Sequence, residues 1–159
     1  MKRIIAGMLL MLWLAGCAST PADTINASGI SIDHTVIPAS AEVGVAVAAY
    51  AGFENSDGDD RLLGVECVCA TSIELHRVVS DGDKVSMTNS FPLTLPAKGR
   101  VEVRPPGTPL HFMLIGTKRA FAVGERVPMR LRFERAGSVE AVFTVVGKSQ
   151  DGWDAWTPD

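Results

Sequence analysis

From about Val43 onward, the chain consists of short apolar or alternating runs separated by turn-forming residues. The separators include SDGDD, SDGD, AKG, PPGTP and ERAG. Many short strands punctuated by Gly, Pro and Asp are typical of antiparallel sandwiches and barrels. The sequence therefore predicts an all-β domain without helices, an antiparallel β-sandwich or barrel of Greek-key type. The runs are VGVAVAAYAGFEN (43–55), RLLGVECV (61–68), SIELHRVV (72–79), KVSMTN (84–89), FPLTL (91–95), RVEVRP (100–105), PLHFMLIG (109–116), VPMRLRFE (127–134) and SVEAVFTVVG (138–147).

The first sixteen residues have the features of an export signal. Lys2 and Arg3 precede the apolar run IIAGMLLMLWL, and small residues then lead to Cys17. The run is too short to be a comfortable membrane span. LAGC (14–17) resembles the bacterial lipobox, in which the peptidase cuts before the cysteine and the cysteine becomes lipid-modified. Ala18, rather than an aspartate, follows Cys17, which favours the outer membrane with the domain facing the periplasm. The alternative is an ordinary signal cut nearby, which leaves Cys17 as a free or paired thiol.

Removal of this signal from the 159-residue chain leaves 143 residues, enough for one domain with a core. The signal holds two basic and no acidic residues, so the formal net charge changes from −3 to −5. This acidity argues against nucleic acid or anionic lipid head groups as partners. We expect a signal peptide (1–16), a flexible tether (17–40), the β-domain (41–147) and a polar tail (148–159), with the lipid as the only membrane anchor.

One predicted hairpin brings a histidine close to a methionine. SIELHRVV-SDGD-KVSMTN has two alternating arms around Asp81-Gly82, a dipeptide suited to a type I′ turn. With these two residues as the loop, His76 lies directly opposite Met87. Such partners point to the same face of the sheet, with Cβ atoms about 4.5–5.5 Å apart.

A second pair lies within the run LHFML. Alternation along a strand places His111 and Met113 on one face, and the leucines and Phe112 on the other. Taken alone, the pair is typical of a satisfied core histidine beside a gap-filling methionine. The hairpin pair changes that interpretation, because the two pairs together supply two imidazoles and two thioethers.

This set of side chains suits monovalent copper. Cu(I) is a soft ion, and thioether sulfur selects it. Methionine has no proton to lose on binding and does not oxidise to a disulfide outside the cytoplasm. Zinc would favour Cys, His and carboxylates, and calcium would take oxygen ligands only. The sequence therefore predicts a Cu(I) site with His76, Met87, His111 and Met113 as ligands.

The spacing of these residues resembles a known family. His76, the ten-residue gap to Met87 and the closing His111-x-Met113 are similar to the motif of the periplasmic copper chaperones called PCu(A)C. The resemblance covers about residues 43–146 and includes AAYAGFEN, DDRLLG, IELH and VPMRLRFERAGSVEAVFTV. It implies a cupredoxin-like β-barrel that binds Cu(I) near its surface. It also implies copper delivery to the binuclear centre of cytochrome c oxidase, on subunit II, often alongside Sco-type proteins.

The chain departs from that family pattern in two places. First, 23 residues separate Met87 from His111, two more than is common in the family. We place the extra pair in the loop around Thr108-Pro109, because an insertion within a strand would turn His111 to the wrong face.

The second departure is Cys67-Val68-Cys69. On an undistorted strand the two cysteines lie about 6.6 Å apart, too far for a disulfide. Three interpretations remain open: two buried small hydrophobes, a disulfide at a bulge, or a second thiol site for copper. We do not include them among the predicted ligands.

Other candidate sites receive structural interpretations. Twelve residues counted from Asp57 in NSDGDD end at Val68, where an EF-hand needs Glu, so a solvated turn is expected. His34 is expected at the surface and Met129 in the core. The chain has no His-Glu-x-x-His, Gly-x-Ser-x-Gly or phosphate-cradling glycine loop, so we predict no enzyme. The alternative to a copper chaperone is a non-metal β-sandwich lipoprotein that serves interaction or assembly in the cell envelope.

Overall fold

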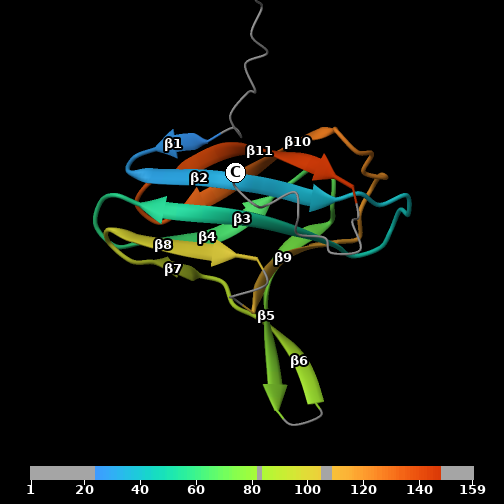
Figure 1. Ribbon diagram of the computed structural model, residues 1–159, viewed down its shortest axis with the longest axis horizontal. Helices are drawn as coiled ribbons and strands as arrows, with labels where there is room; N and C mark the ends of the chain where they lie inside the picture. The colour runs from blue at the N-terminus through green and yellow to red at the C-terminus, as the bar shows by residue number, and fades with distance from the viewer. Residues whose placement is uncertain (1–23, 82–83, 105–108, 148–159) are drawn as a thin grey trace, which may run out of the picture.

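The computed structural model describes residues 24–81, 84–104 and 109–147, which form one strongly curled sheet without helices (Figure 1). The main strand order is β6-β5-β9-β3-β2-β11-β10-β4-β7, with β1 paired to β2 and β8 to β3. The all-β prediction is confirmed, and β3 to β11 correspond to the nine predicted runs. The sheet is mixed, because β11 and β2 pair in parallel. The strands are β1 (Ile25–Ala27), β2 (Ile30–Pro38), β3 (Val47–Asn55), β4 (Asp60–Glu66), β5 (Ser72–Asp81), β6 (Lys84–Asn89), β7 (Leu93–Leu95), β8 (Gly99–Val103), β9 (Leu110–Ile115), β10 (Arg126–Phe133) and β11 (Ser138–Val146).

The domain begins earlier than the sequence predicted. Strands β1 and β2 lie within the expected tether (17–40), so the boundary at residue 41 was wrong. β2 joins the two halves of the sheet, because it pairs with β3 on one side and β11 on the other. Its alternation is interrupted where the register with β3 shifts after Asp33 and His34 takes a positive φ of 50°. The signal peptide, Cys17 and the tail lie outside the described residues. Within the described part, no helix is long and apolar enough to cross a membrane.

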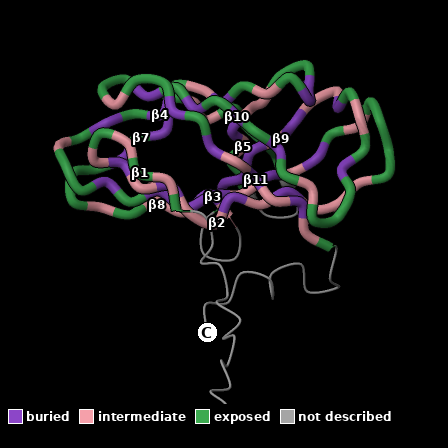
Figure 2. The backbone as a smooth tube through the Cα atoms, turned by 90° about the horizontal axis from the view of Figure 1, so that it is seen from above, coloured by how far each residue is buried: buried purple, intermediate pink, exposed green. Residues whose placement is uncertain are grey.

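Strict alternation builds the core. Along β10 and the first half of β11, exposed and buried residues follow one another in turn (Figure 2). Phe53 packs edge-on against Phe112 and Phe133, with ring centroids 6.3 Å apart in both pairs. Met129 is 2% exposed, which confirms its expected place in the core. Each such buried side chain contributes about 1.5–3 kcal/mol by leaving water.

Strand β5 changes partners along its length. Ser72–Arg77 pairs with β9, whereas His76–Asp81 pairs with β6. The second half of β5 therefore leaves the body of the domain and projects from it as a hairpin with β6 (Figure 1). His76 lies at the junction, the point at which β5, β6 and β9 meet.

The segment NSDGDD forms the turn between β3 and β4 rather than a calcium loop. The Asp60 carboxylate is 4% exposed and accepts hydrogen bonds from the backbone N–H groups of Arg61, Arg135 and Ala136 at 2.7–2.9 Å. Asp59 accepts one from the N–H of Ala97 at 2.7 Å. These oxygen atoms hold two turns together, so they are not available as a cation cage.

We expect Asp60→Asn to lower the free energy of unfolding by about 2–3 kcal/mol at neutral pH, because the amide turns one acceptor atom into a donor facing N–H groups. Burial by itself raises the pKa of Asp60, but the three N–H donors and Arg135 lower it below its ordinary 3.8. A lowered pKa in the folded state stabilises the fold above pH 3.8, and this stability is lost as the pH falls through the folded-state value. Urea unfolding between pH 7 and pH 2 should show the gap between wild type and variant shrinking below pH 3.8. A gap independent of pH would contradict this role for the carboxylate.

Candidate metal centre

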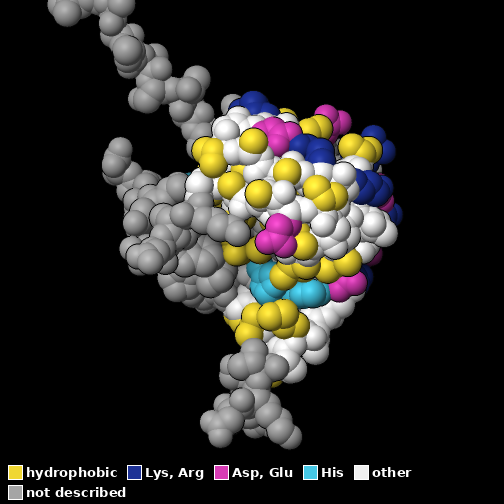
Figure 3. All heavy atoms as spheres, turned by 90° about the vertical axis from the view of Figure 1, so that its right-hand side faces the viewer, with side chains coloured by type: hydrophobic (Ala, Val, Ile, Leu, Met, Phe, Trp, Pro, Cys, Tyr) yellow, Lys and Arg dark blue, Asp and Glu magenta, His cyan; other side chains and the backbone are white. Residues whose placement is uncertain are grey.

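Two histidines face each other across neighbouring strands. In the antiparallel pair of β5 and β9, His76 lies directly opposite His111. Their ring centroids are 5.5 Å apart, and the ring planes are nearly perpendicular at 82°. Figure 3 shows histidine side chains side by side above the projecting hairpin, bordered by hydrophobic side chains. The extra residues between Met87 and His111 therefore do not turn His111 away from His76.

Glu74 holds one nitrogen of His76 and leaves the other available. The Glu74 carboxylate lies 2.7 Å from Nε2 of His76, two residues along the same strand. Nδ1 of His76 is buried and has no hydrogen-bond partner. A carboxylate at Nε2 favours a proton on that atom, so the lone pair is on Nδ1. A buried polar atom without a partner costs free energy, and ligand binding is one way to offset that cost.

Met113 lies on the same face as the two histidines. It is two residues beyond His111 on β9, and its cross-strand partner on β5 is Glu74. It is half-buried, whereas Phe112 and Leu114 are at most 1% exposed on the opposite, core-facing side. The expected division of LHFML between two faces is therefore observed.

Met87 reaches this face from the hairpin, in a register that differs from the predicted one. Met87 pairs with Val78, and His76 pairs with Asn89, so the expected His76–Met87 pairing is wrong. The shift is two residues, which keeps every side chain on its face. Met87 is therefore a diagonal neighbour of His76, and such neighbours are about 7–8 Å apart with Cβ atoms somewhat closer, within reach of a long side chain. Its side chain is 55% exposed.

His111 is electrostatically suited to bind a metal. Only 8% of its surface is exposed, and burial lowers its pKa below the ordinary 6.5, with a further lowering from the charge of His76. A lowered pKa keeps the imidazole neutral near pH 7, the form that donates a lone pair. Within the described ranges, no three His, Cys, Asp or Glu side chains are grouped to hold a metal.

Glu74 is the neighbour that the sequence analysis missed. Its signal was present in IELH, because Glu-x-His on a strand puts both side chains on one face.

The two cysteines are joined to each other. β4 ends at Glu66, and the chain turns there, so the expectation of a strand at Cys67–Cys69 was wrong. The turn brings their Cα atoms to 5.1 Å, and the two sulfurs form a disulfide. Of the three open interpretations, the structure has the disulfide.

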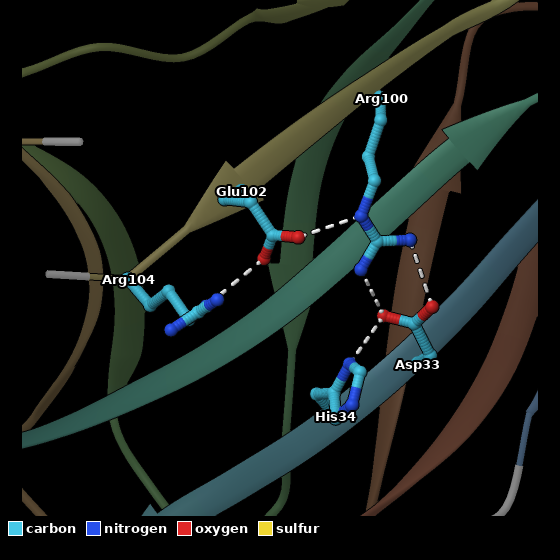
Figure 4. Close-up of polar contacts among 5 residues, drawn as sticks. All are labelled: Asp33, His34, Arg100, Glu102 and Arg104. Atoms are coloured by element: carbon cyan, nitrogen blue, oxygen red, sulfur yellow. Dashed lines mark hydrogen bonds and ion pairs between the residues drawn. The ribbon is translucent and has the colours of Figure 1, made fainter. Parts of the chain in front are cut away.

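His34 belongs to a separate charged network on β2 and β8 (Figure 4). Asp33 receives two hydrogen bonds from Arg100, at 2.8 and 2.9 Å, and lies 2.9 Å from Nδ1 of His34. Glu102 bridges Arg100 and Arg104 at 2.6 and 3.2 Å. Burial by itself raises the pKa of Asp33, but its bonds and charge pairing with Arg100 and His34 lower it overall. Opposite charges pair throughout this network, so we do not assign a ligand to it.

Comparison with known proteins places this geometry in a family. The family model described as "Putative lipoprotein LpqE-like" matches residues 30–145. The copper-bound PCuAC domain from PmoF2 is 27% identical, with a TM-score of 0.67 over 79% of this chain and 99% of that one. The solution structure of CuI-DR1885 from Deinococcus radiodurans is 27% identical, with a TM-score of 0.54 over 83% of each chain. None of the curated proteins compared with the sequence matches it.

These matches confirm the family that the spacing of His and Met indicated. The family model spans most of the curled sheet, from the start of β2 to the end of β11. The similar PCuAC structures have the same all-β architecture as this chain. The chain belongs to the LpqE-like family and has the fold of the PCuAC copper chaperones.

Proposed function

We propose that the protein is a copper chaperone of the bacterial envelope, which binds Cu(I) through His76, Met87, His111 and Met113. The observation that carries this proposal is the buried, unpartnered Nδ1 of His76 beside His111, on the face that also bears both methionines. Two similar structures, the PCuAC domain of PmoF2 and CuI-DR1885, contain copper. The PCuAC chaperones are typically non-enzymatic, and we propose no catalytic role.

Each residue has a distinct part in this proposal. His76 binds through Nδ1, while the Nε2–H group donates a hydrogen bond to the Glu74 carboxylate, which fixes the orientation of the ring. His111 binds as a neutral imidazole from the opposite strand. Met113 and Met87 supply neutral thioethers, which select Cu(I) over Cu(II) and harder ions.

The exposure of the ligands supports transfer rather than storage. His111 is 8% exposed, whereas Met87 is 55% exposed on the projecting hairpin. We propose that Met87 is the ligand an acceptor displaces first, because it is the most accessible of the four. The family resemblance suggests the acceptor: the binuclear copper centre on subunit II of cytochrome c oxidase, with Sco-type proteins as further partners.

The test is a pair of competition titrations, with one probe for Cu(I) and one for Cu(II). We expect one Cu(I) per chain and much weaker binding of Cu(II), which prefers nitrogen and oxygen ligands in tetragonal geometry. The double variant Met87→Leu, Met113→Leu should lose this preference while keeping the fold, because similar-volume apolar changes usually cost less than about 1.5 kcal/mol each. Failure to bind Cu(I) under mild competition would instead favour a non-metal interaction module.

We also propose that Cys17 carries a lipid that anchors the domain at the periplasmic face of a membrane, the outer membrane by the lipobox argument. The family described as lipoproteins supports this proposal. Cys17→Ser should leave the protein unprocessed or released from membranes, because the modified sulfur is then missing. Fractionation and labelled fatty-acid incorporation measure this outcome. Wild-type protein without label, or a variant that stays membrane-bound after processing, would contradict the anchor.

A further inference from the structure

The disulfide between β4 and β5 contributes little to holding the fold together. It joins Cys67 to Cys69, so Val68 is the only residue between them. Closing such a short loop removes little entropy from the unfolded chain. A hydrogen bond also holds the turn in place, because the backbone N–H of Lys118 donates to the carbonyl of Cys69 at 2.8 Å. A role other than cross-linking is therefore open to this bond.

One end of the disulfide is accessible from outside. Val68 is 88% exposed, so the turn presents its tip to solvent. Cys67 is partly exposed, whereas Cys69 is 2% exposed within the core. Cys67 and Val68 line a surface hollow of about 490 Å³. Cys67 is therefore the more accessible of the two cysteines.

The surroundings of Cys67 also suit it as a thiolate. The backbone N–H of Cys69 donates to Sγ of Cys67 at 3.0 Å. A hydrogen bond to a sulfur favours its charged form, so Cys67 is a good leaving group when a mixed disulfide on it is resolved. The hollow has a mixed charged lining with both signs present, so Coulomb forces do not favour a strongly charged partner. Its charged members are Glu66, Lys118, Arg130 and Glu140.

We propose that Cys67–Cys69 is a thiol–disulfide exchange site that takes two electrons from a protein dithiol. A partner thiolate attacks Sγ of Cys67, the bond to Cys69 breaks, and Cys69 leaves as a thiolate that takes up a proton. The partner's second thiolate then attacks its own sulfur in the mixed disulfide, and Cys67 leaves and is protonated. Two electrons and two protons reach this chain, and the partner dithiol becomes a disulfide. Exposed Val68 provides the partner's apolar contact. This inference does not depend on copper.

The test uses the metal-free mature chain and a thioredoxin whose resolving cysteine is replaced by serine. The remaining thioredoxin cysteine should form a trapped mixed disulfide, and peptide mapping should find it on Cys67 at least about ten times as often as on Cys69. Intact thioredoxin should reduce the folded protein fully, with circular dichroism unchanged and Tm lower by no more than roughly 10 °C. Trapping mainly on Cys69 would overturn the assignment. So would a disulfide that thioredoxin reduces only after urea unfolding, because that result defines a protected cross-link.

A matched variant separates protein recognition from simple accessibility. Val68→Asp should slow reduction by thioredoxin about tenfold, as expected when a favourable partner contact is lost. It should change the rate of reduction by dithiothreitol by no more than about twofold. The double variant Cys67→Ser, Cys69→Ser should trap nothing and keep the spectrum of the wild type. Equal slowing with both reductants would overturn the role of Val68 as a partner contact. A double variant that still traps thioredoxin would overturn the site itself.

Discussion

Replacing His111 by alanine is expected to weaken Cu(I) binding at least about a hundredfold, because even losing a group that only supports a metal ligand costs 10–100-fold. The substitution removes a neutral imidazole that lies opposite His76, with ring centroids 5.5 Å apart. Glu74 does not replace it as a ligand, because its carboxylate is engaged with Nε2 of His76. Competition with a chromophoric Cu(I) probe measures the change.

The third histidine provides the matched control. His34 lies beside Asp33 in the network of Figure 4, on β2 rather than on β5 or β9. His34→Ala should leave Cu(I) affinity within about twofold of wild type if no ligand comes from that network. Glu74→Gln should fall between the two variants, because its carbonyl still accepts a hydrogen bond from His76 but without the charge. Equal losses in His34→Ala and His111→Ala would disprove the proposed ligand set.

The sequence predicted correctly which side chains of the hairpin share a face, but it predicted the wrong pairing register. SDGD contains two overlapping dipeptides that fit a two-residue loop, Asp81-Gly82 and Gly82-Asp83, and the predicted register rests on the first. The structure pairs Asp81 with Lys84, which moves the loop to 82–83, outside the described residues. Because side chains alternate with period two, a shift of two residues changes the partner and not the face. Met87 and His76 therefore share a face although they are not directly opposite.

Features that depend on distant parts of the chain were harder to predict. β2 looked like tether because its alternation breaks at Asp33–His34, and its place depends on pairing with β3 and β11. The disulfide depends on where β4 ends, and ECVCATS has no Gly or Pro to mark that end. Each of the nine later runs became a strand, and Gly-, Pro- or Asp-containing turn segments separate most of them.

The two faces of β9 should separate stability from copper binding. Phe112→Ala should lower the free energy of unfolding by about 3–5 kcal/mol, the usual cost of removing a buried aromatic ring. Phe112 is 1% exposed, packs edge-on against Phe53 at 6.3 Å and stacks on Phe91 at 6.2 Å. The cavity left by the ring lies within the cluster of buried core residues, which can relax only partly to fill it. Urea denaturation followed by circular dichroism measures the loss.

Its neighbour should behave in the opposite way. Met113→Leu keeps an apolar side chain of similar volume on the half-buried face, so it should cost less than about 1.5 kcal/mol. It should nevertheless weaken Cu(I) binding about tenfold or more, because leucine offers no sulfur to a soft ion. A large loss of stability with unchanged copper affinity would make Met113 a core residue and remove it from the site. His111 and Met113 flank Phe112 in sequence, so one strand carries both faces. If Phe112→Ala mainly lowers the free energy of unfolding and Met113→Leu mainly lowers Cu(I) affinity, one face of β9 stabilises the fold and the other binds the metal.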